Sequence, residues 1–193
     1  MSGIIEQYKA IWGDDPRQLL DGYTYQPVLT RKLDALDPAA LNAELFYEIV
    51  LWKLNRFPHV DPALLAELRE VAKIAPGHHE QARPVLRRLL QTEGIALPMA
   101  STILRFLNPQ AFQIIDDRVY RVIFPDRHKY PAKPAKLNER YLDKSATIYF
   151  EYLDELHKHA SDKLPFSEAD RILYLLDIKL DNKIGGKPKP RPQ

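Results

Sequence analysis

Apolar residues recur every three or four positions along most of this chain, which is the spacing that places side chains on one face of an α-helix. The spacing predicts amphipathic helices, and only the short stretch 26–30 favours an extended conformation. That stretch is too short to imply a β-sheet. The predicted helical segments are 4–12, 38–57, 62–75, 84–91, 98–107, 119–124, 137–156 and 172–180.

Helix-start signals support several of these segments. Asp37 and Asp61 each precede a proline, a combination in which the aspartate caps a helix and the proline occupies its first turn. The segment that follows Asp37 has a broad apolar face, so we expect this helix at the centre of the core. Ser167 and Asp170 resemble the two ends of a capping box before the last helix.

These elements predict an all-α fold, an orthogonal helical bundle. We expect a single domain over 1–182, followed by a flexible basic tail over 183–193. The chain contains no Cys, which excludes a disulfide framework, a Cys-based metal site and an iron–sulfur cluster. The first residues lack a signal-peptide pattern and no apolar run is long enough to span a bilayer, so we expect a soluble, cytoplasmic protein with no membrane partner.

The segment 84–108 predicts two helices joined by a tight hairpin. Gly94 suits the left-handed position that follows a helix, and Pro98 suits the first turn of the next one. A hairpin of this kind exposes backbone N–H groups at the start of its second helix, and these carry a partial positive charge. The hairpin therefore predicts a seat for a phosphate group.

Segment 84–122 resembles the helix-hairpin-helix DNA glycosylase superfamily of the endonuclease III type. The family's Gly-Val-Gly-Arg-Lys-Thr-Ala falls without a gap on Gly94-Ile-Ala-Leu-Pro-Met-Ala100, and its Val-Asp-Thr-His-Val-x-Arg-Val falls on Ile115-Asp-Asp-Arg-Val-Tyr-Arg-Val122. The second hairpin glycine of the family is Ala96 here. Pro98 stands where bifunctional members hold their Schiff-base lysine, which argues against lyase chemistry through a lysine at that place.

The resemblance implies that Asp116, in the carboxylate segment 114–122, is the catalytic carboxylate. Cleavage of an N-glycosidic bond builds positive charge on the sugar, and a fixed carboxylate can stabilise that charge or orient the attacking water. Asp117 is the second candidate for this role. Both aspartates also have a structural interpretation, because an Asp just before a short helix is commonly its N-cap.

Double-stranded DNA is the partner that the hairpin and the resemblance imply. The formal net charge is only +2, but residues 118–144 contain eight Lys or Arg against three Asp or Glu, which predicts either one positive face or a solvated loop. Aromatic candidates for stacking on a base are Trp52, Phe57, Tyr120 and Tyr130, although an aromatic residue at helical spacing more often packs in the core. The predicted DNA-contacting residues are Gly94, Ile95, Ala96, Met99, Ser101, Arg118, Arg121 and Lys129.

These observations lead to a monofunctional DNA glycosylase of base excision repair, a hydrolase, as the predicted function. We expect no cofactor and no metal, because the histidines at 78–79 and 157–159 lack Cys partners and helical ligand spacing. Two alternatives stay open. The chain can be a helix-hairpin-helix DNA-binding module without catalysis, as Ala96 and Pro98 suggest, or a helical protein-interaction or regulatory protein that binds no nucleic acid.

Overall fold

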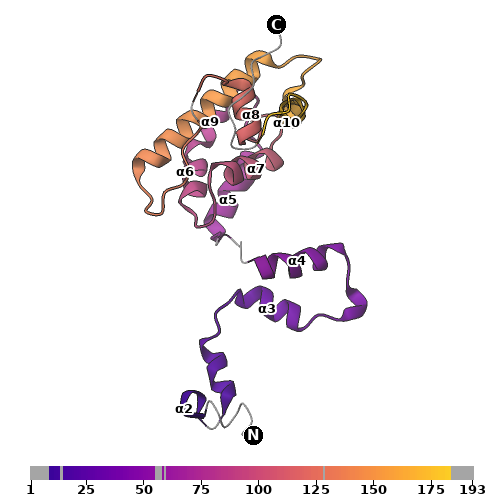
Figure 1. Cartoon of the computed structure of the whole chain (residues 1–193), viewed down its shortest axis with the longest axis vertical. Helices are drawn as coiled ribbons and strands as arrows, with labels where there is room; N and C mark the ends of the chain where they lie inside the picture. The colour runs from indigo at the N-terminus through magenta and orange to yellow at the C-terminus, as the bar shows by residue number, and fades with distance from the viewer. Residues whose placement is uncertain (1–8, 14, 55–57, 59, 128, 184–193) are drawn as a thin grey trace. The chain divides into compact units, whose positions relative to one another are not determined.

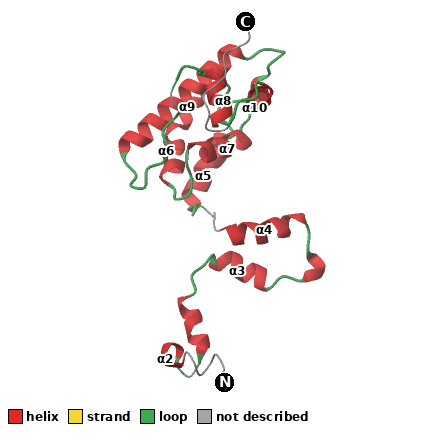
Figure 2. Cartoon of the chain, in the orientation of Figure 1, coloured by secondary structure: helices red, strands yellow, loops and turns green. Residues whose placement is uncertain are grey.

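The computed structural model describes residues 9–13, 15–54, 58, 60–127 and 129–183, and these residues form helices joined by loops (Figure 2). The prediction of an all-α fold is confirmed. In the described ranges, extended backbone pairs at an isolated bridge between Ser161 and Leu164. Apart from Lys183, the predicted tail 183–193 lies outside the described residues.

The chain divides into two compact units, Met1–Phe57 and Pro58–Gln193, where we expected a single domain over 1–182. Pro62, shortly after this division, occupies the first position of the next helix. The helices and 3₁₀ segments described in the first unit are α2 (Lys9–Trp12), η1 (Pro16–Gly22), α3 (Pro27–Asp34), η2 (Pro38–Ala40) and α4 (Ala43–Leu54).

Helix α3 replaces the extended conformation expected over 26–30. Gln26 adopts the left-handed conformation, with φ of 42°, and Pro27 occupies the first helical position. Because proline fixes its own φ near the helical value, it starts the helix directly after the bend. The prediction for this stretch was wrong because a short apolar run does not distinguish a strand from a helix.

Helix α4 begins later than predicted and is not a core helix. Asp37 caps only the 3₁₀ segment η2, whereas the Asn42 side chain accepts the hydrogen bond from the Leu45 backbone N–H, at 2.9 Å, that caps α4. No residue of α4 is buried, and Phe46 is 54% exposed. Within the described residues of the first unit, α4 packs on the eight-residue α3 and has no buried residue, so it is not the central core helix that we expected.

The second unit carries the remaining helices (Figure 1). Helix α9 is the longest, as the pattern over 137–156 predicts, and it runs alongside α6. Helix α5 lies within its predicted segment, and α6, α7, α8 and α10 overlap theirs but begin one to three residues earlier. The elements of this unit are α5 (Pro62–Val71), η3 (His79–Ala82), α6 (Arg83–Gln91), α7 (Leu97–Leu107), α8 (Asp117–Ile123), α9 (Glu139–His159), η4 (Phe166–Glu168) and α10 (Ala169–Lys179).

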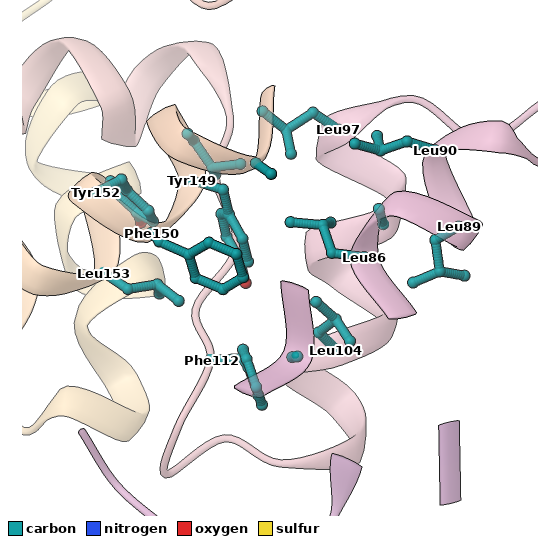
Figure 3. Close-up of a cluster of buried hydrophobic side chains, with 14 of the residues drawn as sticks. Leu86, Leu89, Leu90, Leu97, Leu104, Phe112, Tyr149, Phe150, Tyr152 and Leu153 are labelled. Carbon is teal, nitrogen blue, oxygen red and sulfur yellow. The ribbon is translucent and has the colours of Figure 1, made fainter. Parts of the chain in front are cut away.

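The core of this unit forms where aromatic side chains of α9 meet leucines of α6 and α7. Tyr149 and Phe150 project from α9 toward Leu86 of α6. Leu104 of α7 lies near Phe112 in the same cluster (Figure 3). All five side chains are fully buried or nearly so. Burial of a large apolar side chain contributes about 1.5–3 kcal/mol, so this cluster positions the helices and the connections between them.

The start of α10 also differs from prediction. The helix begins at Ala169 after the 3₁₀ segment η4, and its N-cap residue is Glu168, whose side chain makes no capping hydrogen bond, so Ser167 is not the first residue of a capping box. The Ser167 carbonyl instead accepts a hydrogen bond from the Arg105 guanidinium at 3.1 Å. Asp170 also turns inward, where it is 2% exposed and lies 3.5 Å from Arg105 Nε.

Candidate functional site

The connection between α6 and α7 has the turn geometry that its sequence predicts. Gly94 has φ of 79°, the left-handed conformation that L side chains rarely adopt. Ala96 is the N-cap of α7, although its methyl side chain makes no capping hydrogen bond, and Pro98 lies in the first helical turn. The first backbone N–H groups of α7 therefore follow an N-cap that supplies no side-chain acceptor.

The predicted DNA-contacting residues near this connection differ in exposure. Gly94 and Met99 are exposed, and Ala96 is half-buried. Ile95 and Ser101 are fully buried as whole residues, so neither their side chains nor their backbone atoms are exposed for contact. The Ser101 hydroxyl donates to the Pro98 carbonyl at 2.8 Å. Contact with DNA stays a prediction at all five positions.

Buried tyrosine hydroxyls hold the carbonyl groups of the segment before Asp116. Tyr149 donates to the Gln113 carbonyl at 3.0 Å, and Tyr152 donates to the Ile114 carbonyl at 2.7 Å. Both tyrosines are fully buried in α9, and this burial raises the pKa of each hydroxyl well above its ordinary value. The hydroxyls therefore stay protonated and keep donating at all physiological pH values.

The backbone N–H groups of the same segment bind buried side chains from two other helices. Ile114 N–H donates to the Asp170 carboxylate of α10 at 3.3 Å. Ile115 N–H donates to the Ser101 hydroxyl of α7 at 3.2 Å. Residues from α7, α9 and α10 thus hold the backbone that leads into Asp116. The sequence gives no local signal for these partners, because each lies between 14 and 56 positions away along the chain.

Asp116 caps α8, as its structural interpretation predicts. One carboxylate oxygen accepts the Val119 backbone N–H at 2.8 Å. The side chain is half-buried. Burial raises the pKa of Asp116, and the negative charge of Asp117 acts in the same direction, while hydrogen bonds from the backbone of α8 act against it. A carboxylate has two oxygens and about four acceptor positions, so the cap leaves capacity for a second partner.

Asp117 forms a salt bridge with Lys129. Its Oδ2 atom lies 2.5 Å from the Lys129 ammonium, so Lys129, predicted to contact DNA, is held by this carboxylate. Tyr130 is buried beside the pair, and its pKa is raised first by burial and then by the charge of Asp117. Of the two candidate carboxylates, Asp116 is the one without a cationic side chain bound to it among the described residues.

Arg118 and Arg121 face the interior rather than the surface. Arg118 Nη1 lies 2.8 Å from Asp177 Oδ2, and Arg121 Nε lies 2.7 Å from Asp177 Oδ1. Asp177 is fully buried in α10, and Asn182 also donates to it, at 2.8 Å. Both arginines therefore join α8 to α10. Arg118 and Arg121 were predicted to contact DNA, and in the structure both are paired with Asp177.

Four of the eight basic residues in the stretch 118–144 are paired with carboxylates. Arg127 pairs with Glu151 at 2.8 Å, in addition to the pairs of Arg118, Arg121 and Lys129 described above. Lys133 is different, because its ammonium donates to two backbone carbonyls, those of Thr92 and Ile95. Both carbonyls belong to the α6–α7 connection, and the sequence predicted only a basic loop here.

The described aromatic candidates for base stacking contact other side chains of the chain. Tyr120 and Tyr130 are 4% and 6% exposed, and their ring centroids lie 5.5 Å apart at an angle of 85°. In the first unit, the Trp52 indole N–H donates to the Thr30 hydroxyl at 2.9 Å. Phe57 lies outside the described residues. Core packing, the alternative interpretation of these rings, therefore explains Tyr120 and Tyr130, whereas Trp52 is half-buried in a helix that has no buried residue.

The histidines form an aromatic stack. His79 and His157 lie face to face at 5.5 Å, and His157 lies 3.8 Å from the Phe166 ring. His79 Nε2 lies 3.0 Å from an oxygen of Asp154. Across the described part of the chain, no group of three or more His, Asp or Glu side chains is arranged to hold a metal ion.

Comparisons with protein-family models, with curated proteins and with solved structures yield no match for this chain. None of the helices described is both long and apolar enough to cross a membrane. The resemblance of segment 84–122 to the glycosylases therefore depends on the hairpin, on the carboxylate segment and on their spacing.

Proposed function

We propose that this chain binds duplex DNA through the α6–α7 hairpin and cleaves the N-glycosidic bond of a damaged or modified base. Asp116 is the carboxylate in this proposal, and it stabilises the positive charge that develops on the sugar or orients the attacking water. The hairpin contributes backbone N–H groups at the start of α7 to a phosphate of the DNA strand. Pro98 leaves the chain without a hairpin lysine, so the proposed reaction is hydrolysis without Schiff-base lyase chemistry.

One observation carries the proposal, namely the way the backbone before Asp116 is held. Buried side chains of α7, α9 and α10 bind the carbonyl and N–H groups of Ile114 and the residues on either side of it. A structural N-cap needs no such support, because a cap requires only local geometry. A reacting carboxylate does need it, since catalytic groups act from fixed positions supported by surrounding hydrogen bonds.

The bond between Ile115 and Ser101 supports the link to DNA. Ser101 lies in the second turn of α7, so this bond ties the carboxylate segment to the helix whose N-terminus is the proposed phosphate seat. If a sugar-phosphate strand docks at that N-terminus, the same contact fixes Asp116 relative to the strand. This coupling of binding and chemistry is what proximity effects require.

Base release tests the proposal. We expect the purified chain to release a base from at least one duplex in a panel with damaged or modified bases, detected as an abasic site. Asp116→Asn should reduce the rate about 100-fold or more, whereas Asp117→Asn should retain most of it. Full activity of both variants would contradict the assigned mechanism. No release from any duplex, together with salt-sensitive duplex binding, would favour the non-catalytic alternative.

That alternative, a helix-hairpin-helix module that binds DNA without catalysis, is favoured by one specific contact. An oxygen of Asp116 already caps α8 by accepting the Val119 N–H. A capping role accounts for an Asp at this position without any reaction. The two functions share the hairpin and differ only in whether the second oxygen of Asp116 acts on a substrate.

A further inference from the structure

Lys133 makes an unusual long-range contact with the α6–α7 connection. Its ammonium donates to the Thr92 carbonyl at 2.6 Å and to the Ile95 carbonyl at 2.9 Å. Lys133 lies in the irregular stretch between α8 and α9, about 40 positions along the chain from both partners. One cation therefore binds the turn on both sides of Gly94, its left-handed residue.

The chemistry of the contact explains why a cation is held there. Thr92 is the C-cap of α6, where carbonyl groups carry a partial negative charge. Lys133 is half-buried, and this burial lowers the pKa of its ammonium, while the charge of Glu93 acts in the opposite direction. Burial removes water from the ammonium and so disfavours its charged form. The two carbonyls replace part of that water and stabilise the charged form.

The charge on Lys133 is not cancelled as those of its neighbours are. Arg127 and Lys129 each form a salt bridge with a carboxylate, but Lys133 has none among the described residues. An ammonium has three N–H donors, and the carbonyls take two of them. The contact thus leaves one donor, and a positive charge that no salt bridge of the described residues compensates, at the turn that leads into α7.

We propose that Lys133 is a positioning residue of the α6–α7 hairpin, whose ammonium fixes the turn and places its remaining donor and positive charge toward a backbone phosphate of bound DNA. The inference rests on the function proposed above and adds a residue outside both segments that resemble the glycosylases. The ligand is the sugar-phosphate backbone, so the contribution of Lys133 is independent of base sequence.

Duplex binding by Lys133→Met tests this role. Methionine keeps most of the length of the side chain and removes the charge. Lys136→Met is the matched control, because Lys136 is exposed in the same stretch and makes no contact with the turn among the described residues. Affinity for a labelled undamaged duplex is measured by fluorescence anisotropy over a range of KCl concentrations, for the full chain and both variants.

We expect Lys133→Met to weaken binding and to reduce the slope of log K against log salt concentration by about one, while Lys136→Met matches the unmodified chain. A merely structural role would change affinity without changing the slope. An unchanged slope in Lys133→Met would overturn the inference and leave the proposed function standing. Absence of duplex binding by the unmodified chain would overturn both.

Lysine acetylation of the unmodified chain gives a second measurement that does not depend on the folding of a variant. The rate of acetylation at each lysine is followed by mass spectrometry with and without duplex. We expect bound duplex to slow the reaction at Lys133 several-fold more than at Lys136. Equal protection at the two positions, in a sample shown to bind duplex, would overturn the inference.

Discussion

The Ile115 backbone N–H donates a hydrogen bond to the Ser101 hydroxyl, 3.2 Å away, and both residues are fully buried. Ser101 in turn donates to the Pro98 carbonyl, so a single hydroxyl connects the first turn of α7 to the residue before Asp116. Serine is the smallest side chain that can both accept from one backbone group and donate to another. The Ser101 hydroxyl therefore joins α7 to the backbone before Asp116, and a single substitution removes it.

Ser101→Ala should destabilise the protein by about 1–3 kcal/mol, because it leaves the Ile115 N–H buried without a partner. Thr102→Ala is the matched control. The Thr102 hydroxyl donates to the same Pro98 carbonyl at 2.8 Å, but it accepts no backbone N–H within the described part of the chain. Urea unfolding at neutral pH measures both variants, and equal losses would contradict a special role for the bond to Ile115.

Asp116→Asn should leave stability at neutral pH unchanged within about 0.5 kcal/mol, or raise it, because Asn caps helices as well as Asp does. The pKa of Asp116 is raised in the folded state, chiefly by burial. A raised carboxyl pKa contributes stability that is present below the unfolded pKa and lost as pH rises through the folded pKa. The carboxylate is therefore a cost at neutral pH, and Asn removes this cost.

Asp61 provides the contrast to Asp116. It caps α5 by accepting the Leu64 N–H at 2.7 Å, and this bond lowers its pKa. Asp61→Asn should therefore destabilise the protein at neutral pH, where Asp116→Asn does not. Thermal unfolding at pH 7 and at mildly acidic pH compares the two. A marked loss of stability in Asp116→Asn at pH 7 would indicate that the carboxylate is there for the fold alone.

The local elements of the second unit follow from the sequence, but the partners of the charged residues do not. The spacing of Leu64, Leu68 and Val71 suffices to predict α5, because helix periodicity is a local property. Arg118 and Arg121, in contrast, were assigned to DNA because a basic stretch is all that the local sequence shows. Their partner Asp177 lies 56 or more positions further along the chain, where no local pattern identifies it.

In the first unit, the sequence pattern predicted helix α4 but not which of its residues are buried. Phe46 belongs to a broad apolar face, and that pattern predicts burial, yet its side chain is 54% exposed. Periodicity identifies which residues share a face, whereas burial depends on how much surface the neighbouring elements supply. In the candidate site the same distinction holds, since Asp116 was found from a motif, but Tyr149 and Tyr152, which hold the backbone before it, came only from the fold.

Asp177→Asn should destabilise the protein by about 3–5 kcal/mol, because it leaves Arg118 and Arg121 without a buried counter-charge. Burial alone would raise the pKa of Asp177, but hydrogen bonds from Arg121, Asn182 and Arg118 outweigh it and lower the pKa overall. A lowered carboxyl pKa contributes stability that is present above the unfolded pKa and lost as pH falls through the folded pKa.

The unmodified chain should therefore lose this contribution below about pH 4, the ordinary pKa of Asp. Asp177→Asn should lack that part of the acid dependence, which unfolding by urea at a series of pH values can measure. Glu151→Gln removes the exposed pair with Arg127 and is the matched control, expected to change stability little. A similar small effect at Asp177 would contradict its role as the centre of the α8–α10 contact.

The unmodified chain should lose stability at mildly acidic pH, and His157→Phe should lose less. The pKa of His157 is lowered by burial and by the neighbouring His79, while Asp154 acts in the opposite direction. A lowered histidine pKa means that the fold favours the neutral ring, so stability is complete above the unfolded pKa near 6.5 and falls as pH drops below it. Phenylalanine keeps the stack on Phe166 and cannot take up a proton.

The measurement is the melting temperature of the unmodified chain and of His157→Phe between neutral pH and about pH 5, a range in which unperturbed histidine titrates. We expect the two curves to separate as pH falls, with the variant the more stable at the acidic end. His78→Asn is the control, because His78 is exposed and lies outside the stack. Parallel curves for His157→Phe and the unmodified chain would show that the stacked histidines do not set the acid sensitivity of this fold.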